Sequence, residues 1–465
     1  MRAYRTMYWA AAALSLAILA ACGDDDGGGN TPDAKPPTDA SDPTGDAQPE
    51  PQTIRVTGNI TADTTWSGTN TYVLAESTTV FVTNGATLTI EPGTVVKGER
   101  GSLLVITRGA KINAAGTRDK PILLTSAEPD DAKTRGFWGG LLVLGAAPIN
   151  VNVNSAPPST EATFEAFPAT SAEGKFGGAN PADNSGVIKY VRIDFAGFSY
   201  VEGREFNNFT LCGVGSGTEI DYVQVHGGSD DGIELFGGTV NVKHIISSQN
   251  QDDGFDTDNG WNGKAQFIII QHVTPAGTDA SNGYESDNHA TAASYTADPR
   301  TLPTIYNATL IGKRDHTAHP SFAAIFRRGT GGHYFNHLIV GFPTGIEVRD
   351  AATKAQLDGT PNPNLTLKSS VVFGMGAAGT GLWPAPQASN DIVESDYFTA
   401  TNTFTDPGLP AAATSLTAPV FKPATLATGA TPPNDGFFDP TATFIGAVGN
   451  DDWTAGWTAF PQPIE

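Results

Sequence analysis

The chain has 465 residues, and 49 acidic against 27 basic residues give a formal net charge of −22 at pH 7. This acidity argues against a nucleic-acid-binding protein, because the phosphate backbone requires a basic surface. Two cysteines cannot build a disulfide framework, and 53 glycines with 32 prolines indicate many turns. With 39% apolar residues, the chain can still bury a large core.

The N-terminus has the pattern of a secretion signal. Residues 1–21 hold two arginines and an apolar run over 8–20, which is too short to span a membrane as a helix. The run ends in Leu-Ala-Ala-Cys22-Gly23, which resembles the lipobox of bacterial lipoproteins. That resemblance implies cleavage before Cys22, a diacylglycerol on its thiol and, with Gly23 rather than Asp, a place in the outer membrane, facing either the periplasm or the medium.

An acidic segment follows the predicted lipidation site. Residues 22–52 consist mainly of Asp, Gly, Pro, Thr and Ala, with too few apolar side chains to fold alone. We expect a disordered tether that holds the folded part of the chain clear of the membrane surface.

Short sequence blocks recur through the rest of the chain. Residues 84–94 return 24 positions later at 108–117, and 229–234 return 22 positions later at 251–256. Strand-like runs of three to six residues lie between turn-forming Gly, Asn and Asp, and no ten-residue window has a helical period. A repeat of 22–24 residues with three short strands predicts an all-β fold, a single-stranded right-handed parallel β-helix.

The repeat also divides the chain. We expect the β-helix over 53–375, followed by an irregular wrapping segment and C-terminal cap over 376–465. Trp453 and Trp457 are expected to pack as that end cap, because a solenoid must cover its terminal coil.

The order of several motifs resembles a known group. These motifs are Gly-Ala-Thr-Leu-Thr-Ile-Glu-Pro-Gly-Thr at 85–94, Phe-Trp-Gly-Gly at 137–140, Asp-Asn-Ser-Gly at 183–186 and Gln-Asp-Asp-Gly-Phe-Asp-Thr-Asp at 251–258. Together they resemble bacterial secreted and outer-membrane lipoproteins with a right-handed, pectate-lyase-like β-helix. The resemblance covers about 55–460 and implies the fold and an envelope location, but no settled activity.

Acidic residues recur at one register of the predicted coils. Alternate residues of a strand share a face, which places Ile233, Phe255 and Tyr284 toward the core and their acidic neighbours outward in a column. Stacked carboxylates about 4.8 Å apart repel by about 3.5 kcal/mol at an effective dielectric constant of 20. The acids of this column and of the preceding turns are Asp230, Asp231, Glu234, Asp252, Asp253, Asp256, Asp258, Glu285 and Asp287.

Two interpretations of this acidic column remain open. Ca²⁺ would offset the repulsion, since it binds six to eight hard oxygens in flexible geometry. Alternatively, Asp-Asp-Gly and Asp-Asn-Gly are turns whose side chains bond to their own backbone.

Three functions follow. The leading hypothesis is a lipid-anchored, non-catalytic binding or adhesion module whose acidic groove binds Ca²⁺ and a polysaccharide or an envelope protein. The second is a polysaccharide lyase or glycoside hydrolase acting on acidic glycans, with Arg327 or Arg328 as the base of a lyase, although arginine is a poor base and adjacent arginines commonly pair with acids. The third is a purely structural surface component.

Other motifs carry little chemistry. His316 with His319, and His333 with His337, have metal-ligand spacing only on a helix, which the pattern does not show. Cys212 is expected to be a buried core thiol, and Gly213 to Gly217 a turn between strands.

Overall fold

The computed structural model describes residues 50–156, 159–200, 206–273, 282–315, 321–376, 378–379, 381–384 and 392–464. The predicted signal, Cys22 and nearly all of the tether lie outside these ranges, as do His316 and His319. Among the described residues, no helix is long and apolar enough to cross a membrane.

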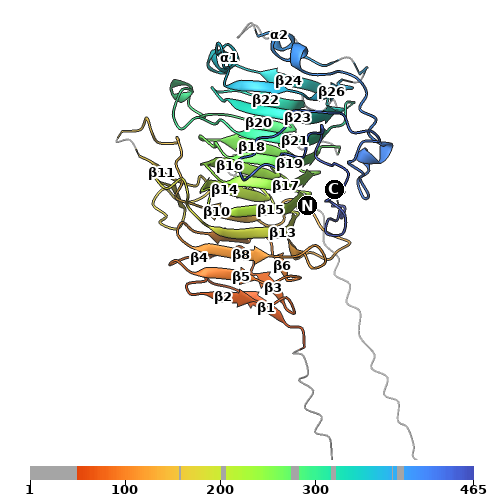
Figure 1. The fold of residues 1–465 in the computed structure, drawn as a ribbon. Coiled ribbons are helices and arrows are strands. Elements are labelled where there is room, and N and C mark those ends of the chain that lie inside the picture. Colours follow the sequence, from red (N-terminus) through yellow and green to blue (C-terminus); the bar gives the residue numbers. More distant parts are fainter. Residues whose placement is uncertain are drawn as a thin grey trace, which may run out of the picture. The chain divides into compact units, whose positions relative to one another are not determined.

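Between residues 53 and 373, the described part of the chain forms a stack of coils (Figure 1). One side of the coils between residues 79 and 348 forms a nine-stranded parallel sheet. Its strands, in chain order, are β4 (Thr79–Val82), β7 (Leu103–Ile106), β10 (Leu141–Leu144), β14 (Phe209–Val214), β16 (Ile233–Gly238), β18 (Phe255–Asp258), β20 (Tyr284–Ser286), β22 (Phe322–Phe326) and β24 (Thr344–Val348).

The other sides of the coils form a fifteen-stranded sheet. Its strands are β1 (Thr53–Val56), β2 (Thr64–Trp66), β3 (Thr71–Leu74), β5 (Thr87–Ile90), β6 (Val95–Gly98), β8 (Lys111–Ala115), β9 (Ile122–Ser126), β13 (Gly186–Asp194), β15 (Glu219–His226), β17 (Asn241–Ser248), β19 (Lys264–Gln271), β21 (Thr304–Ile311), β23 (Gly332–Val340), β25 (Leu365–Lys368) and β26 (Val371–Phe373). The predicted all-β, right-handed parallel β-helix is confirmed.

The repeat found in the sequence is the number of residues in one coil. Thr71 pairs with Val95, and Ile233 pairs with Phe255, offsets of 24 and 22 residues. Ile233, Phe255 and Tyr284 are at most 3% exposed and lie in the central core, as the alternation predicted.

The long strands β13, β15, β17, β19, β21 and β23 each bend at one residue that is not glycine and that has a positive φ angle. The φ angles at Tyr190, Tyr222, His244 and Phe267 are 49°, 55°, 51° and 62°. A bulky residue is uncommon there, because its Cβ crowds the backbone. Stacking of the rings at centroid distances of 4.3, 4.2 and 4.8 Å along these four residues, the aromatic column, offsets that cost.

The chain returns along the side of the coils as a C-terminal strap, residues 411–464. Carboxamide side chains at the corners bind its backbone in both directions: Gln224 to Ala459, Gln266 to Asp439 and Asn336 to Ala430. These side chains of the coils therefore hold the strap by its backbone, and its apolar side chains add a buried cluster that includes Phe421, Trp453 and Trp457.

The tryptophans of the strap do not form the predicted end cap. Trp457 meets the rings of Tyr190 and Tyr222 edge-on at 5.7 and 6.1 Å, and Trp453 meets His244 at 5.0 Å. That expectation is wrong because the outward-facing aromatic column requires an apolar cover along the side of the coils.

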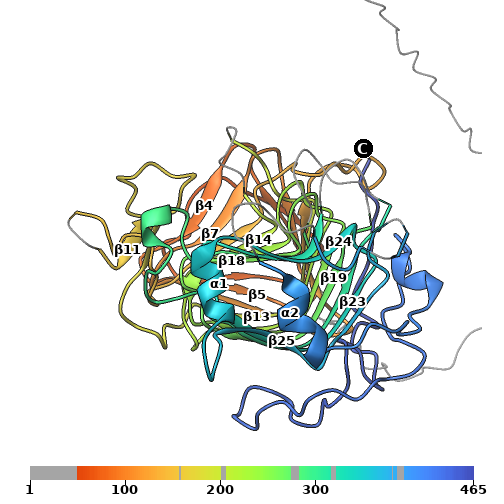
Figure 2. The ribbon, with the colours of Figure 1, turned by 90° about the horizontal axis from the view of Figure 1, so that it is seen from above.

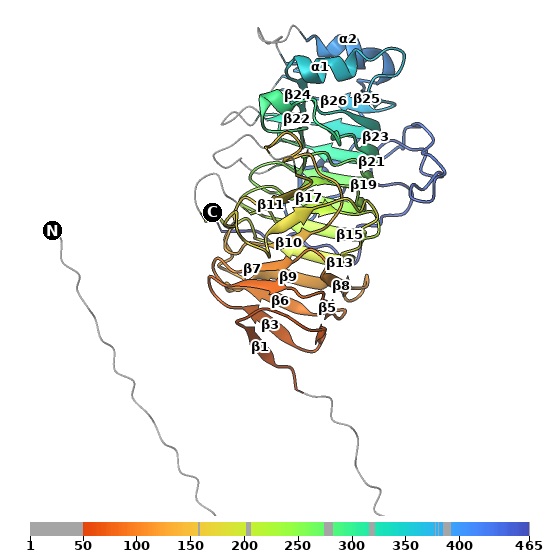
Figure 3. The ribbon, with the colours of Figure 1, turned by 90° about the vertical axis from the view of Figure 1, so that its left-hand side faces the viewer.

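Two short helices close the C-terminal end instead (Figures 1 and 3). They are α1 (Ala351–Leu357) and α2 (Glu394–Phe398), and Leu357 and Phe398 belong to the central core. Asp350 caps α1 by accepting a hydrogen bond from the Thr353 amide. At seven and five residues, both helices are too short for a helical period in the sequence.

The long insertion between β10 and β13 carries a two-stranded hairpin, β11 (Glu161–Thr163) and β12 (Lys175–Gly177). Figure 2 shows this hairpin and the strap on different sides of the coils. Three short 3₁₀ turns complete the described structure, at Ala292–Ser294, Thr399–Thr401 and Ala411–Thr414.

Candidate functional site

The predicted acidic column lies on the outer face of β16, β18 and β20. Glu234 pairs with Asp256, and Asp256 pairs with Glu285, so three carboxylates stand one above another on successive coils. The sequence alternation placed these residues correctly, because parallel in-register strands repeat every side chain directly over its counterpart.

Two of the predicted ligands accept backbone hydrogen bonds from the next coil. Asp231 accepts a hydrogen bond from the Asp253 amide at 2.8 Å, and Asp253 accepts one from the Asn282 amide at 2.7 Å. These carboxylates join successive coils, which differs from the alternative interpretation, in which each side chain bonds to the backbone of its own turn.

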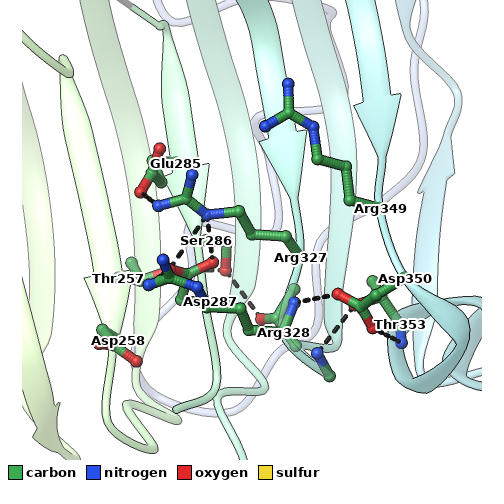
Figure 4. A network of polar contacts seen from close by, with 12 residues as sticks. Thr257, Asp258, Glu285, Ser286, Asp287, Arg327, Arg328, Arg349, Asp350 and Thr353 are labelled. Atoms are coloured by element: carbon green, nitrogen blue, oxygen red, sulfur yellow. Dashed lines mark hydrogen bonds and ion pairs between the residues drawn. The ribbon is translucent and has the colours of Figure 1, made fainter. Parts of the chain in front are cut away.

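Arginine compensates the upper end of the column (Figure 4). Arg327 binds Glu285 and also places Nε 2.9 Å from Asp287, while Arg328 Nη1 lies 2.7 Å from the other oxygen of Asp287. Burial alone would lower the pKa of Arg327, but the charges of Asp287 and Glu285 raise it. Arg327 is therefore not available as the base of a lyase reaction.

Weaker donors serve two further acids. Glu234 Oε2 accepts a hydrogen bond from Asn207 Nδ2 at 2.5 Å. Asp258 accepts one from the Asn259 amide at 2.5 Å. Neither donor carries a positive charge, so the repulsion along this part of the column persists.

Asp256 is the least satisfied member of the column. It is 9% exposed, and its Oδ1 is buried with no hydrogen-bond partner among the described residues. Its carboxylate lies within 4.8 Å of ligand oxygens from Asp231 and Glu234 on one side, and from Asp253 and Glu285 on the other. A third group with the same spacing consists of Asp230, Asp231 and Asp252.

The protonation behaviour follows from burial and repulsion. Burial raises the pKa of Asp256 well above its ordinary value, and the charges of Glu285 and Asp287 raise it further. The pKa values of Asp231, Glu234 and Asp253 are raised for the same first reason. Burial and Asp287 raise the pKa of Asp258 to about 7. These raised pKa values favour protonation of the cluster, and the same carboxylates are close enough together to hold a cation.

The hairpin insertion brings one acid that the sequence did not reveal. The charge of Glu165 helps to raise the pKa of Glu234, and Glu165 also lines a hollow of about 730 Å³ within the insertion. Phe164 fixes this position by stacking on Phe206 at 5.7 Å and meeting Phe236 at 5.9 Å. No local motif signals this contact, because it depends on how a long insertion folds back.

The remaining predicted residues have structural roles. Cys212 is a free, fully buried thiol, as expected. The expected turn over Gly213 to Gly217 is only partly correct, because Gly213 still belongs to β14 and the turn into β15 begins at Gly215. His333 and His337 lie on β23, where His337 contacts the Tyr284 hydroxyl at 3.2 Å and His333 contacts Thr366.

Comparison with protein families matches residues 58–402 to the pectate-lyase-like β-helix domain. No curated protein and no solved structure matches the chain. The family match spans most of the coils and includes the whole acidic column. The chain belongs to the family of pectate-lyase-like β-helix domains.

Proposed function

We propose that this protein is a lipid-anchored, non-catalytic β-helix of the cell envelope that binds Ca²⁺ in its acidic column and a polysaccharide beside it. The observation that carries the proposal is the unpartnered Oδ1 of Asp256, buried between two groups of carboxylates. A buried carboxylate oxygen without a donor is costly, and a cation supplies the missing partner.

The donor set suits Ca²⁺. Asp231, Glu234 and Asp256 offer oxygens within 4.8 Å of one another, and Asp253 and Glu285 extend the set on the other side of Asp256. Ca²⁺ accepts many oxygen ligands in irregular geometry, whereas Mg²⁺ demands a near-ideal octahedron. Bound Ca²⁺ would neutralise the carboxylates that no arginine reaches.

The hollow in the hairpin insertion is the favoured place for the polysaccharide. It adjoins the acidic column through Glu165, and it combines the ring of Phe167 with the polar side chains of Asn152, Thr163 and Lys175. Sugar recognition uses this mixture of an apolar face and convergent polar groups. Membership in a pectate-lyase-like family fits a polysaccharide-related role.

Non-catalytic binding is favoured over cleavage because both candidate bases, Arg327 and Arg328, form ion pairs with carboxylates. Arg327 is bound by two carboxylates, which hold its proton more tightly. Proton abstraction next to a sugar carboxylate requires a group that gives up its proton near the working pH.

The experiment is a glycan-array screen of the purified full chain in detergent, run with Ca²⁺ and with EDTA. We expect binding that EDTA abolishes and that Asp256→Asn removes, with Asp119→Asn, an exposed acid distant in the chain, as the matched control. Glycan binding that is unchanged in EDTA would show that the polysaccharide binds without the metal. The absence of glycan binding in both buffers would point to a structural surface component or to a protein partner.

The anchor is tested separately. Cys22→Ser should move the protein from the detergent phase to the aqueous phase in Triton X-114 partitioning, because it removes the thiol that carries the lipid. Continued partitioning of the variant into detergent would refute lipidation at Cys22 and, with it, the outer-membrane anchoring.

A further inference from the structure

In the part of the chain that the structure describes, the end of the coil stack opposite to α1 and α2 is formed by strands alone (Figures 1 and 3). The first coil consists of β1, the isolated bridge of Ile60 to Val82, and β2. β1 pairs only with β3 and β2 pairs only with β5, so each has one edge without a described partner. We call residues 53–66, with these free edges, the open end.

The C-terminal end of the stack is closed by contrast. The Ser369 amide donates a hydrogen bond to the Thr401 carbonyl at 2.8 Å, and the Val372 amide donates one to the Thr403 carbonyl at 2.9 Å. Residues 401–403 therefore pair with the last coil, and α1 and α2 add side chains to the core there. The open end has no such cover among the described residues.

The backbone of β1 alternates between β3 and the free edge. The Gln52 and Val56 carbonyls accept hydrogen bonds from amides of the next coil at 2.9 and 3.0 Å. Successive residues of a strand direct their backbone groups to opposite edges. The N–H and C=O groups of Thr53 and Arg55 therefore point away from the stack, where no described residue pairs with them.

The core beneath the open end holds these strands in place. Trp66 stacks on Tyr72 with a centroid distance of 4.8 Å, and the two side chains are 3% and 4% exposed. The Tyr72 hydroxyl also accepts a hydrogen bond from the Ser67 amide at 2.8 Å. An edge that is already ordered loses little conformational entropy when another strand pairs with it.

The first coil lacks most of the features that prevent edge pairing. Exposed edges are commonly protected by lysines, other charges or prolines. Residues 51–75 contain no lysine, and their one proline, Pro51, precedes β1. Their two charges are already compensated, because Arg55 binds Glu99 and Asp63 accepts a backbone hydrogen bond at 2.8 Å. In a chain with a net charge of −22, this coil is neutral.

We propose that the open end pairs with the open end of a second copy of this chain about a two-fold axis, with β1 antiparallel to β1 of the partner. Such an interface is self-complementary and extends the sheets by strand addition. A second β-helix end offers edges on all three sides of the coil, whereas one extended peptide covers a single side. The preceding residues 22–49 suit these edges poorly, since they include five prolines, which have no N–H for a ladder.

Sedimentation velocity of the full chain with Cys22→Ser, which removes the predicted lipidation site, tests the pairing in EDTA over a wide range of concentration. We expect a dimer. Thr53→Pro should raise its dissociation constant about tenfold or more, because each copy loses one outward N–H and gains a ring at the edge. Thr53→Ala is the matched control and should stay dimeric. Equal melting temperatures of the two variants would show that Thr53→Pro still folds.

A second measurement does not depend on proline. Thr53 is exposed, and antiparallel pairing of β1 with its copy brings the two Thr53 residues close together. Thr53→Glu alone and Thr53→Lys alone should therefore be monomeric, because like charges meet, whereas an equal mixture of the two variants should form dimers.

Three results would overturn the proposal: a wild type that is monomeric at every concentration, a Thr53→Pro variant that dimerises like Thr53→Ala, or a Glu and Lys mixture that stays monomeric. A monomeric wild type would leave the open end to an extended segment of a different protein. Neither Ca²⁺ nor a glycan is present, so failure here is distinct from failure of the proposed function.

Discussion

Asp256→Asn is the sharpest test of the acidic column. Asparagine keeps the shape of the side chain and removes only its charge. In wild-type protein Asp256 faces carboxylate oxygens on both sides at no more than 4.8 Å. The substitution should therefore stabilise the metal-free protein and remove the stabilisation that Ca²⁺ gives to the wild type.

The magnitude follows from that distance. Two full charges at 4.8 Å repel by about 3.5 kcal/mol at an effective dielectric constant of 20, and partial protonation reduces this figure. In EDTA at pH 8, we expect Asp256→Asn to raise the free energy of unfolding by roughly 2–4 kcal/mol. With Ca²⁺ at 100 times its dissociation constant, the wild type should gain about 2.7 kcal/mol and the variant almost nothing.

The assay is thermal unfolding in EDTA and in Ca²⁺, together with calorimetric titration of Ca²⁺ into the metal-free protein. Asp119→Asn, at an exposed turn, should behave as the wild type in both. An Asp256→Asn variant that binds Ca²⁺ with unchanged affinity would refute the metal site. A variant that is less stable than the wild type in EDTA would refute the claim that uncompensated repulsion is stored there.

Three further predictions concern the surroundings of the site. In EDTA the protein should be more stable at pH 5 than at pH 8. Acids whose pKa is raised by folding stabilise the protein fully below their unfolded pKa near 4, and this stabilisation is lost as the pH rises through the folded pKa, about 7 for Asp258. A melting temperature that rises from pH 5 to pH 8 would contradict the raised pKa values of the acidic column. Arg327→Gln should lower the free energy of unfolding by about 2–4 kcal/mol at pH 8 and by less at pH 5, because it leaves Glu285 and Asp287 without their cation. Urea unfolding measures this, with the exposed Arg118→Gln as the control. An equal loss at both pH values would argue against the ion pairs. Trp457→Ala should lower the free energy of unfolding by about 3–5 kcal/mol, because the ring is only 2% exposed. Leu416→Ala, at a side chain that is 39% exposed on the same strap, should lower it by less than about 1 kcal/mol. Similar unfolding midpoints for the two variants would show that the strap is not packed as described.

Much of the fold could be predicted because it follows from short repeats and from alternation between neighbouring residues. The 22-residue return of Asp-Asp-Gly placed Glu234 over Asp256, and the apolar–acidic alternation separated Phe255 from Asp256. Both patterns depend only on neighbouring residues and on a constant coil length, so they survive in a single sequence.

The partners of the column could not be predicted in the same way. Glu285 pairs with Ile325, 40 residues later, because an insertion lengthens that coil, and the register of Arg327 over Asp287 cannot be counted from a constant period. The contact of Glu165 and the docking of Trp457 likewise join segments whose separation no repeat fixes. Long insertions and returning segments are placed by tertiary packing rather than by local pattern.

The position of the strap at the C-terminal end of the chain means that the aromatic column is covered last during synthesis. Gln224, Gln266 and Asn336 are synthesised long before the backbone groups at Ala459, Asp439 and Ala430 that they bind. During synthesis, the aromatic column therefore remains uncovered until the strap, residues 411–464, has been made. A chain that stops before Trp453 is expected to leave those rings exposed to proteases and to other incomplete chains.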